Sequence, residues 1–232
     1  MGLFRKASPA TGLDREQIAA AFLRGEGLEI GALHLPLRLP PGARARYVDR
    51  MSVADLRRQY PELANKPLVT PDIIDNGETL ATVADGSADF VVANHFLEHC
   101  EDPIRTLQNL TRVLRPGGIL FCAVPDKRTC FDRDRATTTL DHLLRDHREG
   151  PEGSRRDHYI EWARDVDKLV EPYFSAQVNG YMEMRYSIHF HNWTPEAFLE
   201  FLVHVLREQL VPAELVHFTS RPEEMIALLR RR

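Results

Sequence analysis

Residues 85–126 read DGSADFVVANHFLEHCEDPIRTLQNLTRVLRPGGILFCAVPD, and this stretch decides the fold class. Residues 88–94 are an almost unbroken apolar run of strand length, which is typical of a strand buried on both faces. Residues 102–114 then place apolar side chains at helical spacing, and Asp102 is a suitable helix N-cap. Residues 119–124 are again apolar. The order strand, helix, strand predicts two parallel strands joined by a helix.

The same alternation continues on both sides of this stretch. On its N-terminal side we expect helices over residues 14–24 and 53–60, strands over 28–33 and 45–49, and an extended segment over 67–75. On its C-terminal side we expect helices over 138–147, 155–170 and 194–207, and an antiparallel strand pair over 213–219 and 224–230, with a helix as the alternative for the last segment. The pattern predicts an α/β fold: a Rossmann-like, seven-stranded, mostly parallel sheet with its last strand antiparallel and helices on both faces.

The chain length suits one domain that carries an insertion. Its 232 residues include 43% hydrophobic and 8% aromatic side chains, which is typical of an ordered globular protein. After residue 124 the strand pattern stops for about sixty residues, a length that favours an inserted cover over a plain loop. We therefore expect residues 1–232 to form a single domain with residues 129–191 as a helical cap.

Charge and cysteine content exclude several classes of protein. The chain has 30 basic and 34 acidic side chains and a net charge of −4, so it has no broad positive field for a nucleic-acid backbone. Cys100, Cys122 and Cys130 are odd in number and form no CxxC pair, which favours reduced thiols over disulfides or a zinc knuckle. Residues 1–11 contain no apolar run and no window has roughly 18 apolar residues, so we expect a cytoplasmic protein without membrane anchor.

Polar residues follow the predicted strands at the edge where a parallel sheet binds its ligands. Gly31 follows the first strand and lets the backbone approach a ligand. Asp49 ends the second strand, 49 − 31 = 18 positions later, where nucleoside-binding α/β folds place an acid on the ribose hydroxyls. Because only one glycine of a GxGxxG pattern is present, a pyrophosphate cradle and hence a dinucleotide are disfavoured.

Residues 28–33 (LEIGAL), 47–50 (YVDR) and 85–126 together resemble the class I S-adenosylmethionine-dependent methyltransferases, in particular the type 11 methyltransferase group. The resemblance implies S-adenosylmethionine as the cofactor. It implies a cofactor site made of Glu29 and Gly31 at the methionine end, Asp49 and Arg50 at the ribose, Asp75 and Asn76 near the adenine, and Asn94 and His95 near the sulfonium. The chain departs from the family pattern at Leu33 and Leu35, which replace the second and third glycines.

Histidines near the fourth strand are candidates for proton transfer. His95 and His99 could serve as general bases because histidine titrates near working pH, while a structural role is the alternative for each. His95, Glu98 and His99 would share one face of a helix and resemble the metal-binding E-x-x-E-H cluster of small-RNA and ubiquinone-pathway methyltransferases. Hard cations prefer oxygen, and here His95 replaces the first glutamate, so we expect no metal.

Two further groups are candidates for substrate binding. His189 and His191 would share one face of an extended segment and could close the pocket from its far side, or they could form a satisfied polar strand face. Asp126 and Arg128 follow the fifth strand and belong either to a polar acceptor site or to a solvated turn. The predicted cap over residues 129–191 would then form the acceptor side.

The expected reaction is methyl transfer to an oxygen, or less favourably a nitrogen, of a small polar acceptor. A sugar or glycan intermediate is preferred by family analogy alone. We expect neither long nucleic acid nor a membrane as a partner, and a homodimer is left open. The alternatives are a nicotinamide-binding oxidoreductase and a non-catalytic methyltransferase-like binding protein.

Overall fold

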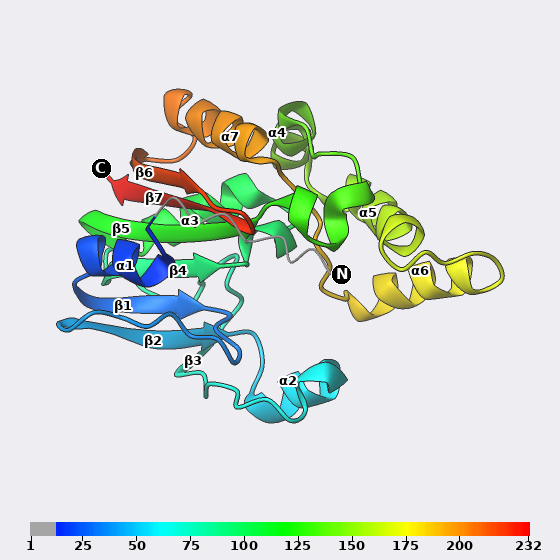
Figure 1. The fold of residues 1–232 in the computed structure, drawn as a ribbon, viewed down its shortest axis with the longest axis horizontal. Helices are drawn as coiled ribbons and strands as arrows, with labels where there is room; N and C mark the ends of the chain where they lie inside the picture. The colour runs from blue at the N-terminus through cyan, green and yellow to red at the C-terminus, as the bar shows by residue number, and fades with distance from the viewer. Residues whose placement is uncertain (1–12) are drawn as a thin grey trace, which may run out of the picture.

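A seven-stranded sheet forms the centre of the computed structural model, which describes residues 13–232 (Figure 1). The strands are β1 (Gly25–Ile30), β2 (Ala43–Asp49), β3 (Ile73–Ile74), β4 (Ala88–Asn94), β5 (Leu114–Pro125), β6 (Ala213–Ser220) and β7 (Glu224–Arg231). Their order in the sheet is β3-β2-β1-β4-β5-β7-β6. The prediction for residues 1–11 lies outside the described residues.

The sheet is parallel except for β7, which runs antiparallel to both of its neighbours. The predicted Rossmann-like fold with an antiparallel last strand is therefore confirmed, and residues 224–230 form a strand rather than the alternative helix. β5 begins at Leu114, five residues before the predicted start, because Leu114 already pairs with Ala88 across an irregularity in the register. Pro116, Gly117 and Gly118, residue types that are typical of the end of a helix, thus lie inside a strand.

Helices cover both faces of the sheet (Figure 1). The helices are α1 (Arg15–Phe22), α2 (Val53–Gln59), α3 (Pro103–Arg112), α4 (Leu140–Glu149), α5 (Glu152–Asp165), α6 (Tyr173–Met184) and α7 (Pro195–Arg207). α1 packs Ile18 against Phe90 and Phe121 on one face. α3 and α7 cover the opposite face.

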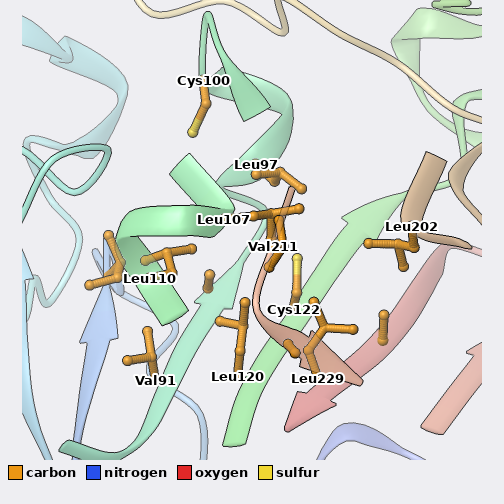
Figure 2. Close-up of a cluster of buried hydrophobic side chains, with 14 of the residues drawn as sticks. Val91, Leu97, Cys100, Leu107, Leu110, Leu120, Cys122, Leu202, Val211 and Leu229 are labelled. Carbon is orange, nitrogen blue, oxygen red and sulfur yellow. The ribbon is translucent and has the colours of Figure 1, made fainter. Parts of the chain in front are cut away.

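The larger core lies between the sheet and the pair α3 and α7 (Figure 2). Leu107 and Leu110 of α3 and Leu202 of α7 meet Val91 and Leu120 of the sheet, and all five side chains are fully buried. α3 begins where it was predicted, since the carboxylate of its N-cap residue accepts the third helical N–H at 2.8 Å. For α3, the capping residue and the spacing of the apolar residues therefore predict the same helix that packs against the sheet.

Residues between β5 and α7 form the helices α4, α5 and α6 beyond the carboxyl ends of the parallel strands (Figure 1). α6 was not predicted from the sequence, and α5 ends at Asp165 rather than at residue 170. α5 and α6 enclose a small core of their own, built around Tyr159, Val178 and Tyr181. No helix in the described part of the chain has the length and apolar composition that a membrane crossing requires.

Candidate functional site

The carboxyl ends of β1, β2 and β4 lie side by side and border a cavity of about 350 Å³. Ile30 pairs with both Val48 and Ala93, so the segments that follow these strands start at the same edge of the sheet. Six residues predicted for the site line this cavity: Gly31, Asp49, Arg50, Asn76, His95 and His99. The structure thus brings together residues that are up to 68 positions apart (99 − 31 = 68).

Backbone conformation explains the glycine after β1. Gly31 has φ +62°, in the left-handed region, and an added Cβ would lie no closer than 4.0 Å to Phe96. Conformation, and not crowding, therefore requires glycine. Leu33 stands where the family pattern has its second glycine, and it keeps φ +50° at a cost of about 1–2 kcal/mol. The local turn survives the loss of that glycine.

Asp49 ends β2 with its carboxylate beside the cavity. Its Oδ1 accepts the backbone N–H of Met51 at 3.2 Å. Burial raises the pKa of Asp49, against the opposing effect of hydrogen bonds from the backbone of Met51 and Arg50. The Arg50 guanidinium donates to the hydroxyl of Tyr60, and both residues line the cavity.

Glu29 and Asn94 line a smaller adjoining cavity of about 220 Å³. Glu29 is buried, its Oε1 accepts the N–H of Leu37 at 2.8 Å, and its Oε2 has no hydrogen-bond partner. Burial raises the pKa of Glu29 to about 7. Both side-chain polar atoms of Asn94 are also buried without a partner. Such orphaned groups are costly unless a ligand satisfies them.

Asp75 does not reach the cavity that it was predicted to line. Its carboxylate accepts hydrogen bonds from the N–H groups of Asn76 and Thr82 and from the Thr82 hydroxyl, all at 2.7 Å. The side chain therefore holds its own turn, and Asn76 alone of the predicted adenine pair lines the cavity. Gly77 lines it too, and an added Cβ at this position would lie 2.4 Å from the Ile30 side chain.

His95 lies at the junction of the two cavities with φ +49°. Its Nε2–H donates to Glu224 at 3.1 Å, and Glu224 also accepts from Arg15. Burial opposes ionisation of Glu224, but the hydrogen bonds from His95 and Arg15 outweigh it and lower the pKa of Glu224 to about 2. An ionised carboxylate thus fixes the tautomer of His95 and leaves Nδ1 free to accept a proton.

His99 lies deeper and is a weak base. Its Nδ1–H donates to the Ile188 carbonyl at 2.9 Å, and the Ser187 hydroxyl lies 3.1 Å away. Burial, with the nearby His189, lowers the pKa of His99 to about 3. His99 is therefore neutral at working pH and accepts a proton poorly, which argues against its predicted role as general base.

The predicted helical face of His95, Glu98 and His99 does not form. His95 has a left-handed backbone, and only Leu97–His99 form a short 3-10 helix. Glu98 and His99 instead meet His189, with ligand atoms within 4.8 Å of one another. Both Glu98 carboxylate oxygens are buried without a hydrogen-bond partner. This group has the donor atoms to bind a divalent cation, although the closest Glu98 to His189 distance is 4.0 Å.

His189 and His191 do not share a face, because residues 185–192 form no strand. The His189 Nδ1–H donates to Asp132 at 2.6 Å, which places His189 in the group with Glu98 and His99. His191 is fully buried in a different group and lines none of the three cavities. The predicted pair therefore divides between two clusters.

Asp126 and Arg128 form an ion pair with each other. The Arg128 Nη2 lies 2.6 Å from the Asp126 carboxylate, and neither side chain lines a described cavity. Asp126 is buried and also caps the following turn by accepting the N–H of Arg128 at 3.0 Å. The alternative of a salt-bridged turn fits these contacts better than a substrate site.

A third, polar cavity of about 330 Å³ adjoins the 350 Å³ cavity, and both are lined by Arg50, Asn76, Glu78, His99 and Ser187. Burial and the neighbouring Glu101 raise the pKa of Glu78 on its wall to about 7. Arg105 and Arg185 also line it, and neither lies within 4.0 Å of a carboxylate in residues 13–232. Its lining is therefore strongly polar and contains available cationic donors.

Sequence reasoning missed several residues of the site: Glu224, Ser187, Arg105 and Arg185. No local signal could identify them, since each belongs to a segment that reaches the sheet edge only in the folded chain. Glu224, for example, lies 129 positions from His95. The only hint in the sequence was the charge of Glu224, which is the first residue of the final strand.

Comparison with known proteins gives a match over part of the chain. Residues 40–122 match the family model described as "Methyltransferase domain". The human protein named "Thiol S-methyltransferase TMT1B" is 36% identical over 92 residues, which cover 35% of this chain and 34% of that protein. The chain thus matches about a third of the length of this curated relative.

Solved structures share the fold at low sequence identity. A putative methyltransferase from Bacillus halodurans has a TM-score of 0.51 at 14% identity, covering 93% of this chain and 96% of that one. A structure titled as putative Zn-dependent alcohol dehydrogenases from Rhodobacter sphaeroides has a TM-score of 0.52 at 17% identity, covering 91% and 86%. These likenesses concern the fold, and a fold does not by itself decide the activity.

Proposed function

We propose that this chain, whose residues 40–122 form a methyltransferase domain on a class I methyltransferase fold, transfers a methyl group from S-adenosylmethionine to a small polar acceptor. The family predicted from the sequence is confirmed by that match and by the seven-stranded sheet. S-adenosylmethionine is the cofactor that the family and the fold indicate. The observation that carries the proposal is the cavity at the ends of β1, β2 and β4, where Gly31 and Asp49 meet.

The cavity residues fit this cofactor. The Asp49 carboxylate lies where it can accept from two ribose hydroxyls, since its hydrogen bond from Met51 uses only one of its lone pairs. The unpaired oxygen of Glu29 and the unpaired amide of Asn94 offer acceptors and donors to an amino-acid group in the adjoining cavity. The absence of a glycine triplet suits a cofactor without phosphate.

The polar cavity of about 330 Å³ supports a polar acceptor beside the cofactor. Arg105 and Arg185 can donate to acceptor oxygens, and Glu78 can accept from hydroxyls. A hydroxyl must lose a proton during transfer. His95 lines the two cofactor cavities rather than the acceptor cavity, and it is the better oriented base because Glu224 fixes its tautomer. Positioning of the acceptor would supply much of the remaining rate.

A sugar or glycan hydroxyl remains our preferred acceptor, and a thiol is the second candidate. The second candidate is favoured by the name of the human relative, which is a thiol S-methyltransferase. Incubation with S-adenosylmethionine and either a panel of sugars or a panel of small thiols would separate them. Methyl transfer confined to thiols would reject the oxygen acceptor while leaving the cofactor assignment intact.

Calorimetric titration of the full chain with S-adenosylmethionine and S-adenosylhomocysteine tests the cofactor assignment. We expect binding of both, weakened about 10- to 100-fold in Asp49→Ala, because a hydrogen bond to a charged group contributes about 1.5–3 kcal/mol. Asp157→Ala, on the exposed surface of α5, is the matched control and should bind normally. Binding of NAD instead would favour the oxidoreductase alternative, and binding of none of these would favour a non-catalytic protein.

A further inference from the structure

Three histidines from distant segments meet outside the cavities. They are His142 of α4, His158 of α5 and His191 ahead of α7, and their ligand atoms lie within 4.8 Å of one another. The ring centroids are 4.9, 5.1 and 5.7 Å apart, and the ring planes are inclined at 67–87° to one another. None of the three lines a described cavity. Ring nitrogens of three histidines within 4.8 Å of one another offer the donor atoms of a zinc site.

Asp146 supplies a fourth donor to this cluster. Its Oδ2 lies 3.0 Å from the Nε2 of His142 and 3.8 Å from the Nε2 of His158, and these two nitrogens are 3.1 Å apart. Zinc bonds of 2.0–2.1 Å in a tetrahedron place neighbouring donor atoms about 3.3 Å apart. The three separations among His142, Asp146 and His158 bracket that value. The ligand atom of His191 lies within 4.8 Å of those of the other two histidines and would have to move closer to complete the tetrahedron.

His191 has one ring nitrogen without a hydrogen-bond partner. The residue is fully buried, and its Nε2–H donates to the Glu101 carbonyl at 3.2 Å. That hydrogen bond leaves the lone pair on Nδ1, and Nδ1 is buried with no hydrogen-bond partner. The Ser154 hydroxyl donates to Asp146 at 2.8 Å and orients the carboxylate. Such supporting contacts are typical of the outer shell of a metal site.

We infer that His142, Asp146, His158 and His191 form a structural zinc site that joins α4 and α5 to the segment before α7. Three imidazole nitrogens and one carboxylate suit zinc, whereas magnesium and calcium prefer oxygen donors. Four protein ligands would close the coordination sphere and leave no open position for substrate, so the role is structural. The site is independent of the proposed methyl transfer.

Arg145 competes with the metal for this site. Its guanidinium donates to the Nδ1 of His142 at 2.8 Å, so in the zinc-free chain the proton of His142 lies on Nε2. Zinc binding at Nε2 requires the other neutral tautomer, in which that proton has moved, by exchange with solvent, to Nδ1. A protonated Nδ1 no longer accepts from Arg145, so the Arg145 contact breaks. The Arg145 side chain is half exposed and can turn into water. Removing Arg145 should therefore strengthen zinc binding.

Metal counting on the full chain tests the inference. The purified protein is stripped with a chelator, reloaded with zinc sulfate and analysed for bound zinc after gel filtration. We expect about one zinc per chain in the wild type and in the control His204→Ala, and loss of that zinc in His142→Ala. His142 is partly exposed, so its substitution is the least disruptive of the three histidines. Circular dichroism of the zinc-free proteins would check that the variant folds.

Two further variants make the test specific. Arg145→Ala should bind zinc about tenfold more tightly, since one charge-assisted hydrogen bond no longer competes. His189→Gln should keep its zinc, because His189 belongs to the separate group with Glu98 and His99. Zinc that is lost in His189→Gln but kept in His142→Ala would overturn the inference. A wild-type chain that binds no zinc would overturn it as well.

Discussion

Glu224 joins three distant parts of the chain, and its charge should contribute strongly to stability. It is the first residue of β7 and accepts hydrogen bonds from Arg15 of α1, at 3.0 Å from Nε, and from His95 after β4, at 3.1 Å. These contacts lower its pKa to about 2 from an ordinary 4.5. The substitution Glu224→Gln removes the negative charge and keeps the shape.

The pKa values set the size of the effect. A depression from 4.5 to about 2, at 1.36 kcal/mol for each pKa unit, corresponds to about 3 kcal/mol for the ionised form of Glu224. Because the folded pKa is the lower one, this stabilisation is present above pH 4.5 and disappears as the pH falls toward 2. Glu224→Gln should therefore lower the free energy of unfolding by about 3 kcal/mol at pH 7 and by much less near pH 2.

Urea unfolding at pH 7, 5 and 3, followed by circular dichroism, measures this difference. The control is Glu214→Gln on β6, whose ion pair with Arg230 is half exposed and should contribute about 1 kcal/mol or less. The reasoning would be refuted if Glu224→Gln and the wild type differed by less than 1 kcal/mol at pH 7. A difference that did not shrink between pH 5 and pH 3 would refute it equally.

Other substitutions test the core and the cavities. Leu107→Ala should lower the free energy of unfolding by about 2–5 kcal/mol in urea titration, because Leu107 is fully buried. Gly77→Ala should weaken S-adenosylmethionine binding in calorimetry, because its Cβ would lie 2.4 Å from Ile30, whereas Gly153→Ala meets open space and should not. The wild-type pH profile of turnover between pH 6 and 8 should show no ionisation of His99, because burial lowers its pKa to about 3, and His99→Ala should leave the shape of that profile unchanged. A chelator should lower Tm through the proposed zinc site without abolishing turnover; loss of turnover restored by one cation would instead indicate a catalytic metal.

Local patterns were sufficient for the fold class. Apolar runs of strand length and amphipathic runs of helix length depend on neighbours in the sequence, and β4 and α3 formed almost at their predicted bounds. The ligand-binding edge of the sheet could be predicted as well, because parallel strands place their carboxyl ends together. For this reason Gly31, Asp49 and Asn76 could be assigned to one cavity from the sequence.

Predictions from local patterns were wrong where pairing or packing decides the structure. β5 extends back to Leu114 because its neighbour β4 offers a partner, which overrides the helix-end signal at residues 116–118. α6 was missed because its apolar side chains are separated by polar residues and Gly180, and it forms by packing on α5. Asp75 was predicted to contact a ligand, but its carboxylate satisfies its own turn.

The sequence by itself determined the α/β class, the order of most elements and the residues at the ends of the parallel strands, because those depend on short-range periodicity and on the geometry of every parallel sheet. Only the tertiary structure decided which side chains from distant segments meet. It pairs His95 with Glu224, and it separates His189 from His191 into two clusters. These contacts result from the packing of the whole chain, which no local spacing encodes.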